Sequence, residues 1–251
     1  MGAQRIIGII PARYASTRFP GKPLALIHGK PMIQVVCEQV AQAGLDQHVV
    51  ATDDPRIQDA VRQFGGQVLL TRPDHPSGTD RCGEAADQLK LSDDDVVINI
   101  QGDEPFISAR EINLIASLFE RPDVQIGTLV KPFSDKARAE NPNIVKAVLA
   151  ADGRALYFSR YPVPYVRDPQ AATPLYHQHL GIYAYRYKTL KALTRLTPSS
   201  LESCEKLEQL RWLENGYSIH TASCQYEGIG IDTPEDLARI EQEDIFPPKH
   251  S

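Results

Sequence analysis

Residues 6–23 read IIGIIPARYASTRFPGKP. The run Ile6–Ile10 consists of four isoleucines and one glycine, a pattern typical of a strand buried on both faces of a parallel sheet. The run ends at Pro11, and the residues after it are mostly small, polar or basic. These properties predict a first buried strand whose carboxyl end leads into a basic loop over residues 12–23.

Strand-like and helix-like patterns alternate as far as residue 119. Further strand-like runs occur at 48–51, 67–70 and 96–100. Helical spacing is predicted over 31–40, 54–64, 79–89 and 108–119, with Ser108 and Glu111 spaced as in a capping box. Because the connections are short, this order predicts an α/β fold with a doubly wound, mostly parallel sheet. Ligands of such sheets bind at the carboxyl ends of the strands, so we expect the loops after the first and fourth strands to face one crevice.

The pattern changes after residue 130. Strand-like runs flank Ala151-Asp152-Gly153, a strong hairpin signal. We predict that residues from about 132 to 196 form a mixed β lobe inserted in the main sheet. The whole of 1–246 is then a single domain, and 247–251 is expected to be a disordered tail.

Two helices are predicted near the end of the chain. The first covers 201–214, where apolar residues recur at helical spacing: Leu201, Cys204, Leu207 and Leu210. The second begins after Thr233, a typical N-cap residue that is followed by Pro234. Trp212 is expected to pack in the core.

Composition restricts the class of protein. The chain has 251 residues and a net charge of −5, whereas a general nucleic-acid binder is usually basic. The four cysteines have no C-x-x-C spacing, and no apolar run approaches the roughly 18 residues of a membrane span. We therefore expect a cytoplasmic, soluble protein that binds neither nucleic acid nor membrane.

The first 37 residues contain no Asp or Glu, although the chain as a whole is acidic. Arg13, Arg18 and Lys22 supply three cations within ten positions, and Gly21 lets the backbone turn or approach a ligand closely. A triphosphate needs such opposing charges together with backbone N–H groups. The loop is not a Walker A motif, and its residues alone fit a triphosphate site and a solvated basic loop about equally well.

Two acidic residues follow apolar runs. Asp103 lies in the segment QGDEP after the fourth predicted strand, and Asp232 precedes the cap of the last helix. Carboxylate oxygens are ligands that Mg²⁺ prefers, and that ion takes its other ligands from waters and substrate phosphates. From the residues alone, both acids also fit a structural role at a turn or helix cap. The segment 71–81, TRPDHPSGTDR, is likewise compatible with an ordinary polar loop capped by Ser77 or Thr79.

Several of these segments occur together in one family. The segments that carry the resemblance are IIPAR at 9–13, SGTDR at 77–81, QGDEP at 101–105, LYFSR at 156–160, HLGIY at 179–183, LEQLR at 207–211 and DTPEDL at 232–237. In this combination and order the chain resembles the 3-deoxy-manno-octulosonate (Kdo) cytidylyltransferases, also called CMP-Kdo synthetases. The resemblance implies a fold like that of the nucleotide-diphospho-sugar transferases, a homodimer through the inserted lobe, and Mg²⁺ as cofactor. It also implies a reaction that forms CMP-Kdo and pyrophosphate for lipopolysaccharide biosynthesis.

The resemblance also implies roles for individual residues. Arg13 and Lys22 would hold the phosphates of CTP. Ser77 and Gly78, with the backbone near Ala12, would recognise cytosine. Asp103 and Asp232 would bind the metal. The sugar acid would be surrounded by Arg18, Arg81, Gln101, Arg160, His179, Tyr183, Glu208 and Gln209.

The sugar carboxylate needs a fixed cation, for which we expect either Arg160 or Arg81. Two alternatives to the Kdo enzyme remain: a cytidylyltransferase for sialic acid, which is also a 2-keto acid sugar, and a nucleotide-binding module without catalytic activity.

Overall fold

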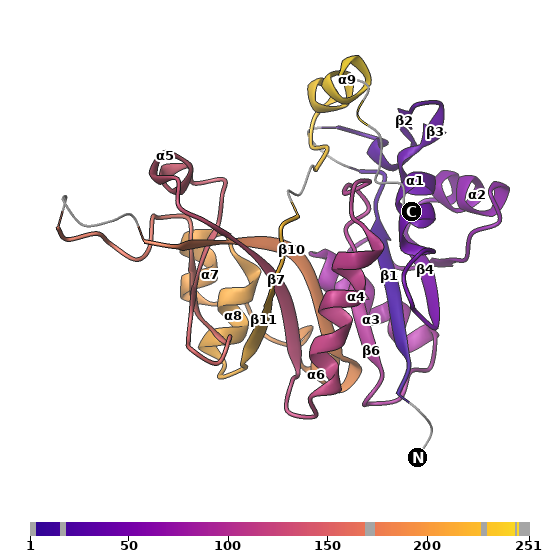
Figure 1. The fold of residues 1–251 in the computed structure, drawn as a ribbon. Helices are drawn as coiled ribbons and strands as arrows, with labels where there is room; N and C mark the ends of the chain where they lie inside the picture. The colour runs from indigo at the N-terminus through magenta and orange to yellow at the C-terminus, as the bar shows by residue number, and fades with distance from the viewer. Residues whose placement is uncertain (1–3, 16–18, 169–173, 227–229, 244, 246–251) are drawn as a thin grey trace.

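The computed structural model describes residues 4–15, 19–168, 174–226, 230–243 and 245. In this part of the chain a nine-stranded sheet has the order β11-β7-β10-β6-β1-β4-β5, with β8 attached to β10 and β9 to β8 (Figure 1). Its strands are β1 (Ile6–Ala12), β4 (Gln47–Thr52), β5 (Val68–Leu70), β6 (Val96–Asn99), β7 (Ile126–Phe133), β8 (Lys146–Leu149), β9 (Ala155–Ser159), β10 (Tyr176–Arg186) and β11 (Ile219–Ser223). A separate small ribbon pairs β2 (Leu26–Ile27) with β3 (Lys30–Pro31).

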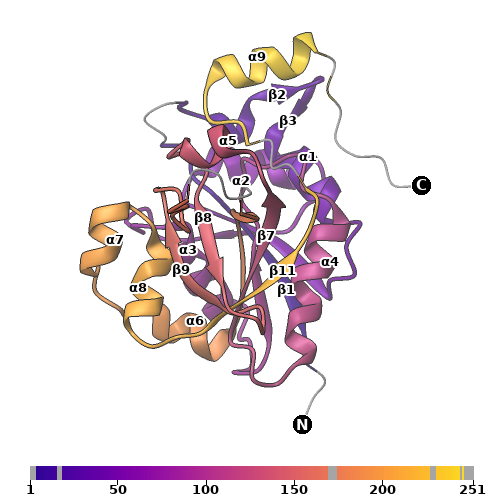
Figure 2. The ribbon, with the colours of Figure 1, turned by 60° about the vertical axis from the view of Figure 1, so that its left-hand side comes forward.

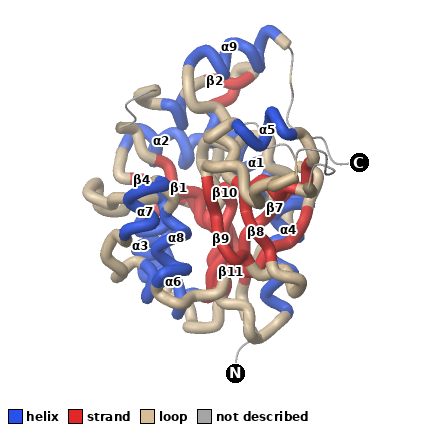
Figure 3. The backbone as a smooth tube through the Cα atoms, turned by 90° about the vertical axis from the view of Figure 1, so that its left-hand side faces the viewer, coloured by secondary structure: helices blue, strands red, loops and turns tan. Residues whose placement is uncertain are grey.

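Helices surround this sheet. The α-helices are α1 (Met32–Val40), α2 (Pro55–Gln63), α3 (Gly78–Gln88), α4 (Ala109–Ser117), α5 (Lys136–Glu140), α6 (Tyr187–Leu193), α7 (Ser200–Glu205), α8 (Glu208–Glu214) and α9 (Pro234–Gln242). Two short 3₁₀ helices are η1 (Lys22–Leu24) and η2 (Leu118–Glu120). Figure 3 shows the strands as a central layer between helices, with α9 above that layer.

Strand β1 lies inside the sheet, parallel to β4 on one side and to β6 on the other. Its side chains alternate between two hydrophobic clusters because successive residues of a strand point to opposite faces. Ile7 and Ile9 belong to a cluster that includes residues of α3, α6 and α8. Ile10 and Ala12 belong to a cluster with residues of α1, α2 and α4. Helices therefore cover both faces of the sheet (Figure 2), and the prediction of a doubly wound α/β fold is confirmed.

The sheet is parallel from β6 to β5 and mixed beyond β6. Strand β10 is antiparallel to both β6 and β7, and β11 is parallel to β7. Strand β10 belongs to the segment 132–196, for which an inserted lobe is predicted, but it lies within the central sheet, between β7 and β6. The hairpin β8–β9, formed where Ala151-Asp152-Gly153 predicted it, joins β10 at the pair Gln178 and Lys146. The predicted tail, 247–251, lies outside the described residues.

The prediction of one continuous helix over 201–214 is wrong. The chain forms α7 and α8, which are separated at Lys206, a residue with φ of 54° in the left-handed region. Helix α7 buries none of its residues, so the helical spacing of Leu201 and Cys204 does not mark a core face. A tertiary contact stabilises the break, because the guanidinium of Arg160 donates to the carbonyl oxygens of Glu205 and Lys206.

The capping box predicted at Ser108 is also absent from the described contacts of α4. Ser108 Oγ donates to the buried carboxylate of Glu111, so the two side chains pair with each other and not with the backbone. The last helix behaves as predicted. Thr233 and Asp236 form a reciprocal capping box at the start of α9. Trp212 is 1% exposed and packs edge-on against Tyr183 and Tyr185, as a core residue should.

No helix among the described residues has both the length and the apolar character needed to cross a membrane.

Asp95 ties the N-terminal segment to the edge of β6. Its side chain is 4% exposed and accepts hydrogen bonds from the N–H of Arg5, the N–H of Ser92 and the guanidinium of Arg5. Burial opposes ionisation of this carboxyl, but these hydrogen bonds outweigh that effect and hold its pKa below the usual 3.8. Asp95 therefore stabilises the folded chain while it is ionised.

Replacing Asp95 with Asn should lower the free energy of unfolding at pH 7 by about 1.5–3 kcal/mol, because an amide cannot accept all these bonds. The pKa of Asp95 is lower in the folded protein than in the unfolded chain. Its contribution to stability is therefore present above about pH 4 and is lost as the pH falls through the native pKa. The difference between wild type and Asp95→Asn, measured by denaturant unfolding, should therefore shrink below pH 4. Asp94→Asn, at the exposed neighbouring position, is the control. Equal stability of Asp95→Asn and wild type at pH 7 would contradict this account.

Candidate functional site

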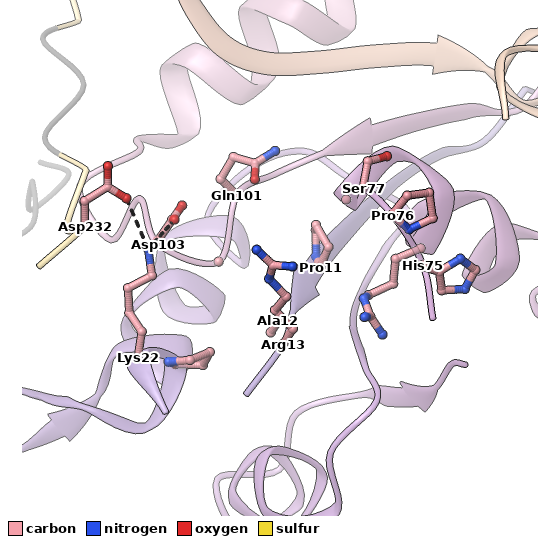
Figure 4. Close-up of a pocket in the computed structure, with 14 residues that line it drawn as sticks. Pro11, Ala12, Arg13, Lys22, His75, Pro76, Ser77, Gln101, Asp103 and Asp232 are labelled. Carbon is pink, nitrogen blue, oxygen red and sulfur yellow. Dashed lines mark hydrogen bonds and ion pairs between the residues drawn. The ribbon is translucent and has the colours of Figure 1, made fainter. Parts of the chain in front are cut away.

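A cavity of about 250 Å³ lies at the carboxyl ends of β1 and β6. Its wall combines the end of β1, η1, the start of α3 and the loop after β6 with Asp232, which precedes α9. Figure 4 shows Arg13, Lys22, Ser77, Gln101 and Asp103 around this space. The expectation that the loops after these two strands face one crevice is confirmed.

The ammonium group of Lys22 lies between two carboxylates of the cavity wall. Its Nζ atom is 2.5 Å from Asp103 Oδ2 and 3.4 Å from Asp232 Oδ1 (Figure 4), and it donates to the carbonyl oxygen of Ile231 at 2.9 Å. The backbone before Lys22 turns at Gly21, which has φ of 72° and donates to the carbonyl oxygen of Tyr14. A side chain at position 21 would be strained in this left-handed conformation.

The chemistry of these two acids fits a divalent cation. Both carboxylates lie within 4 Å of a single positive atom, Lys22 Nζ, so one cation can contact both. Burial raises the pKa of Glu104 to about 7, and the nearby charges of Asp103 and Asp232 add to that effect. Within the described ranges no three His, Cys, Asp or Glu side chains are grouped to hold a metal. Further ligands of an ion here would therefore be waters and substrate oxygens, as is usual for Mg²⁺.

The opposite wall of the cavity is the start of α3. Ser77 caps this helix by accepting the N–H of Asp80 at 3.2 Å, which confirms one of the two predicted caps. A Cβ at Gly78 would lie 3.4 Å from the ring of Pro11, so α3 and the end of β1 approach closely at this point. The N–H groups at the start of a helix and its dipole favour a polar or anionic ligand.

Arg81 lies deeper in the same wall. Its side chain is 4% exposed, pairs with Asp53 at 3.6 Å, and donates to Thr71 Oγ1 at 2.6 Å. Arg81 and Gln101 are the two predicted sugar ligands found among the residues that line the cavity. Arg18 falls outside the described residues.

The other predicted sugar ligands, the second group, come from β10 and α8 and include Arg160, the residue directly after β9. His179 lies 5.2 Å from Tyr183 between ring centroids, and its Nε2 is 3.2 Å from Thr128 Oγ1. Burial lowers the pKa of His179 to about 3, so its imidazole is neutral at physiological pH. Tyr183 Oη and Gln209 Nε2 are buried and have no hydrogen-bond partner in the described part of the chain. Such atoms are costly unless a ligand or water satisfies them.

Glu208 connects this second group to the cavity wall. Its carboxylate accepts the hydroxyl of Thr79 at 2.7 Å and the guanidinium of Arg211 at 3.1 Å. Burial raises the pKa of Glu208, and the hydrogen bonds only partly offset that effect. Thr79 follows Ser77 and Gly78 at the start of α3, so Glu208 makes the two groups neighbours.

Arg160 is held by the protein backbone. Its guanidinium donates to the carbonyl oxygens of Glu205 at 2.7 Å, Pro142 at 3.0 Å and Lys206 at 3.3 Å. These bonds direct it to the end of α7. Of the two arginines considered for a sugar carboxylate, Arg81 therefore lines the cavity, whereas Arg160 is not among the lining residues.

Sequence reasoning missed His75 and Thr79. His75 lines the cavity with a side chain that is 5% exposed, although no sequence motif singles it out. Thr79 was considered only as a helix cap. Their position on either side of Ser77 and Gly78 was the available signal, because neighbours of ligand-binding residues at a strand-to-helix turn often share the site.

Comparisons with known proteins agree with this geometry. The family model described as cytidylyltransferase matches residues 7–219. The 3-deoxy-manno-octulosonate cytidylyltransferase of Cytophaga hutchinsonii is 52% identical over 241 residues, which cover 94% of this chain and 96% of that protein. The protein of the same name from Bacteroides thetaiotaomicron is 54% identical over 245 residues, covering 95% and 97%.

Solved structures give the same result. A CMP:2-keto-3-deoxy-manno-octonic acid synthetase complexed with CTP is 43% identical, with a TM-score of 0.88 over 96% of this chain and 100% of that one. A 4-diphosphocytidyl-2C-methyl-D-erythritol synthase from Anaerococcus prevotii shares the fold at 13% identity, with a TM-score of 0.59 over 96% and 98%.

Gly102 provides a direct test of the close packing at the cavity floor. A Cβ at this position would lie 2.9 Å from the carbonyl oxygen of Pro11, a backbone atom that cannot rotate away. Gly102→Ala should therefore separate β1 from the loop after β6 and lower the free energy of unfolding by about 1–3 kcal/mol, with loss of ligand binding.

Gly44→Ala is the matched control for Gly102→Ala, because its Cβ would meet Asn113 Oδ1 at an ordinary 3.7 Å. Both effects can be measured by thermal unfolding and by CTP binding. The packing argument fails if Gly102→Ala is as stable as Gly44→Ala and binds CTP equally well.

Proposed function

Because the chain belongs to the family of 3-deoxy-manno-octulosonate cytidylyltransferases, we propose that it transfers CMP from CTP to the anomeric hydroxyl of Kdo, forming CMP-Kdo and pyrophosphate. The observation that carries this proposal is the cavity in which Lys22 faces Asp103 and Asp232 across from the Ser77 wall. Such a cavity offers cations for a triphosphate, carboxylates for a metal, and a helix start for a nucleobase.

The proposed step is an in-line substitution at the α-phosphorus of CTP. The anomeric hydroxyl of Kdo loses its proton to water as its oxygen forms the new O–P bond, the bond from phosphorus to the bridging oxygen of the β-phosphate breaks, and pyrophosphate leaves. Arg13 and Lys22 bind the phosphates and stabilise the negative charge that grows on the leaving group. Since the chemistry depends mainly on position and charge, the protein contributes by fixing both substrates in one cavity.

We propose Asp103 and Asp232 as the residues that hold Mg²⁺. The ion would supply positive charge to phosphate oxygens and lower the pKa of the attacking hydroxyl. Lys22 forms ion pairs with both carboxylates in the described structure. A divalent cation between them would repel its ammonium group, and the side chain would then be available to a phosphate.

The sugar acid is proposed to bind where the two groups of polar residues meet. Arg81 and Gln101 line the cavity, and Arg81 is the cation that we assign to the sugar carboxylate. Tyr183 Oη and Gln209 Nε2 are buried donors without a partner among the described residues. A sugar hydroxyl that accepted their hydrogen bonds would remove the free-energy cost of leaving them unsatisfied. His179, Glu208, Arg160 and Arg18 complete the proposed sugar pocket. The neutral imidazole of His179 can both donate and accept a hydrogen bond.

A homodimer is proposed through the segment that contains β8 and β9. Three large apolar side chains are exposed on β9 and in the chain after it: Leu156 at 56%, Tyr161 at 67% and Tyr165 at 78%. Large apolar side chains exposed within one short segment are compatible with an interface.

The proposed substrates, CTP and Kdo, are small molecules, and the proposed compartment is the cytoplasm.

Pyrophosphate release from CTP, UTP, ATP and dTTP, each mixed with Kdo, sialic acid or a hexose phosphate, tests the proposal. We expect release from CTP with Kdo and at least roughly a hundredfold lower kcat/KM with sialic acid, because its N-acetyl group and longer tail leave polar groups unpaired. Comparable use of sialic acid would overturn the sugar assignment, and equal use of UTP would overturn the base assignment. Absence of release with every pair would favour a nucleotide-binding module.

The two proposed metal ligands can be tested separately. Asp103→Asn and Asp232→Asn should each lower kcat by roughly a hundredfold or more without unfolding the protein, because charge stabilisation at the phosphates is lost. Glu235→Gln, at an exposed position beside Asp232, should leave kcat unchanged. Activity measured against Mg²⁺ concentration and circular dichroism distinguish loss of metal from loss of fold. Near-normal activity of either Asn variant at limiting Mg²⁺ would remove that residue from the site.

A further inference from the structure

The loop over residues 71–77 connects β5 to α3 and forms one side of the cavity. His75 and Pro76 line the cavity beside Ser77 and Gly78. Backbone hydrogen bonds anchor the loop at its ends, where Thr71 N–H donates to the carbonyl oxygen of Thr52 and Ser77 O accepts from Arg81 N–H. The middle of the loop contacts side chains of α3.

Glu84 of α3 is the residue that these contacts share. Its carboxylate accepts the N–H of Arg72 at 3.0 Å, pairs with His75 Nε2, and accepts the amide of Gln88 at 3.2 Å. Burial opposes ionisation of Glu84, but the hydrogen bonds from Arg72 and His75 outweigh it and hold its pKa below the ordinary value. An ionised carboxylate only accepts hydrogen bonds, so His75 Nε2 is the donor in this pair.

We propose that Glu84 is a positioning residue for the nucleobase of CTP. Through Arg72 and His75 it fixes the loop 71–77, and thereby the place of Ser77 and Gly78 against the end of β1. The inference rests on the proposed function, in which Ser77 and Gly78 recognise cytosine. Glu84 itself does not line the cavity, so it acts through the loop and not by contact with CTP.

The proposed phosphate and base contacts come from different segments of the cavity wall, so loss of the Glu84 contacts should affect them differently. Arg13 and Lys22, which would hold the phosphates, come from a different segment than the loop 71–77. A loosened loop should therefore weaken base binding while the charges around the reacting phosphate stay in place. Sites that identify a ligand by hydrogen bonds lose discrimination when their polar groups shift, so preference for CTP over UTP should fall as well.

Glu84→Leu tests the proposal because it removes both acceptor oxygens and leaves an apolar side chain that is one atom shorter. The KM for CTP should rise roughly tenfold, as expected when the loop's donors lose their partner, while kcat changes less than about twofold because the charges around the phosphates stay in place. The ratio of kcat/KM for CTP over UTP should fall. Glu84→Gln, which keeps one acceptor oxygen and the shape, should recover most of the loss.

Asp87→Leu is the matched control. Asp87 is another carboxylate of α3, but its oxygen pairs with the hydroxyl of Tyr187 and not with the loop. This variant should lose stability without a change in the KM for CTP or in base preference. If Glu84→Leu behaves in the same way as Asp87→Leu, the role of Glu84 is structural and the proposal is wrong.

Two further measurements keep the test decisive. If Glu84→Leu does not fold, His75→Phe serves as a second variant, because it keeps an aromatic ring but removes the N–H that donates to Glu84. It should raise the KM for CTP. An unchanged KM for CTP would overturn the proposal. If wild type itself releases no pyrophosphate, the proposed function fails. Calorimetric binding of CTP to wild type and to Glu84→Leu would then still test the loop, because equal affinities would overturn its role.

Discussion

The ammonium group of Lys22 joins three segments that are far apart in the chain. It contacts Asp103 after β6, and it contacts Asp232 and the carbonyl of Ile231 before α9. The N–H of Ile231 in turn donates to the carbonyl oxygen of Asp103. Ile231 also belongs to a small hydrophobic cluster with Ile27 and Ile240, so packing and the ion pairs together hold the start of α9 beside Lys22. Without the cation, two carboxylates would face each other at the rim of one cavity, which is costly.

The location of this charge cluster follows from the path of the chain through the sheet. From β1 the chain passes through α1 to β4, and later returns through α3 to β6 on the other side of β1. Helices α1 and α3 lie in different clusters, on opposite faces of the sheet. The crevice at such a point of divergence is where doubly wound sheets bind ligands, since neither connection covers it. Gly102 lets the loop after β6 approach the end of β1 there.

The parts of the structure that sequence could predict are those governed by local rules. The isoleucine run of β1, the cap at Thr233 and the hairpin around Gly153 depend on nearby residues, and each occurs as expected. The helix over 201–214 failed because its break depends on Arg160, which lies about forty residues earlier in the chain. The cavity residues could be named from the family resemblance. Their distances could not, because Lys22, Asp103 and Asp232 meet only when three separate segments pack together.

The same reasoning explains why the proposed sugar pocket was hard to locate from sequence. Its residues come from α3, β10, α8 and the chain after β9, and the hydrogen bond from Thr79 to Glu208 connects α3 to α8. Glu208 begins α8 immediately after the break at Lys206, so the position of its carboxylate depends on the contacts that end α7. Arg160, directly after β9, supplies those contacts. Arg160, itself a proposed contact of the sugar acid, therefore also fixes the position of Glu208. This connection lets the backbone around α7 influence both substrate subsites, because Thr79 lies on the same helix turn as Ser77 and Gly78.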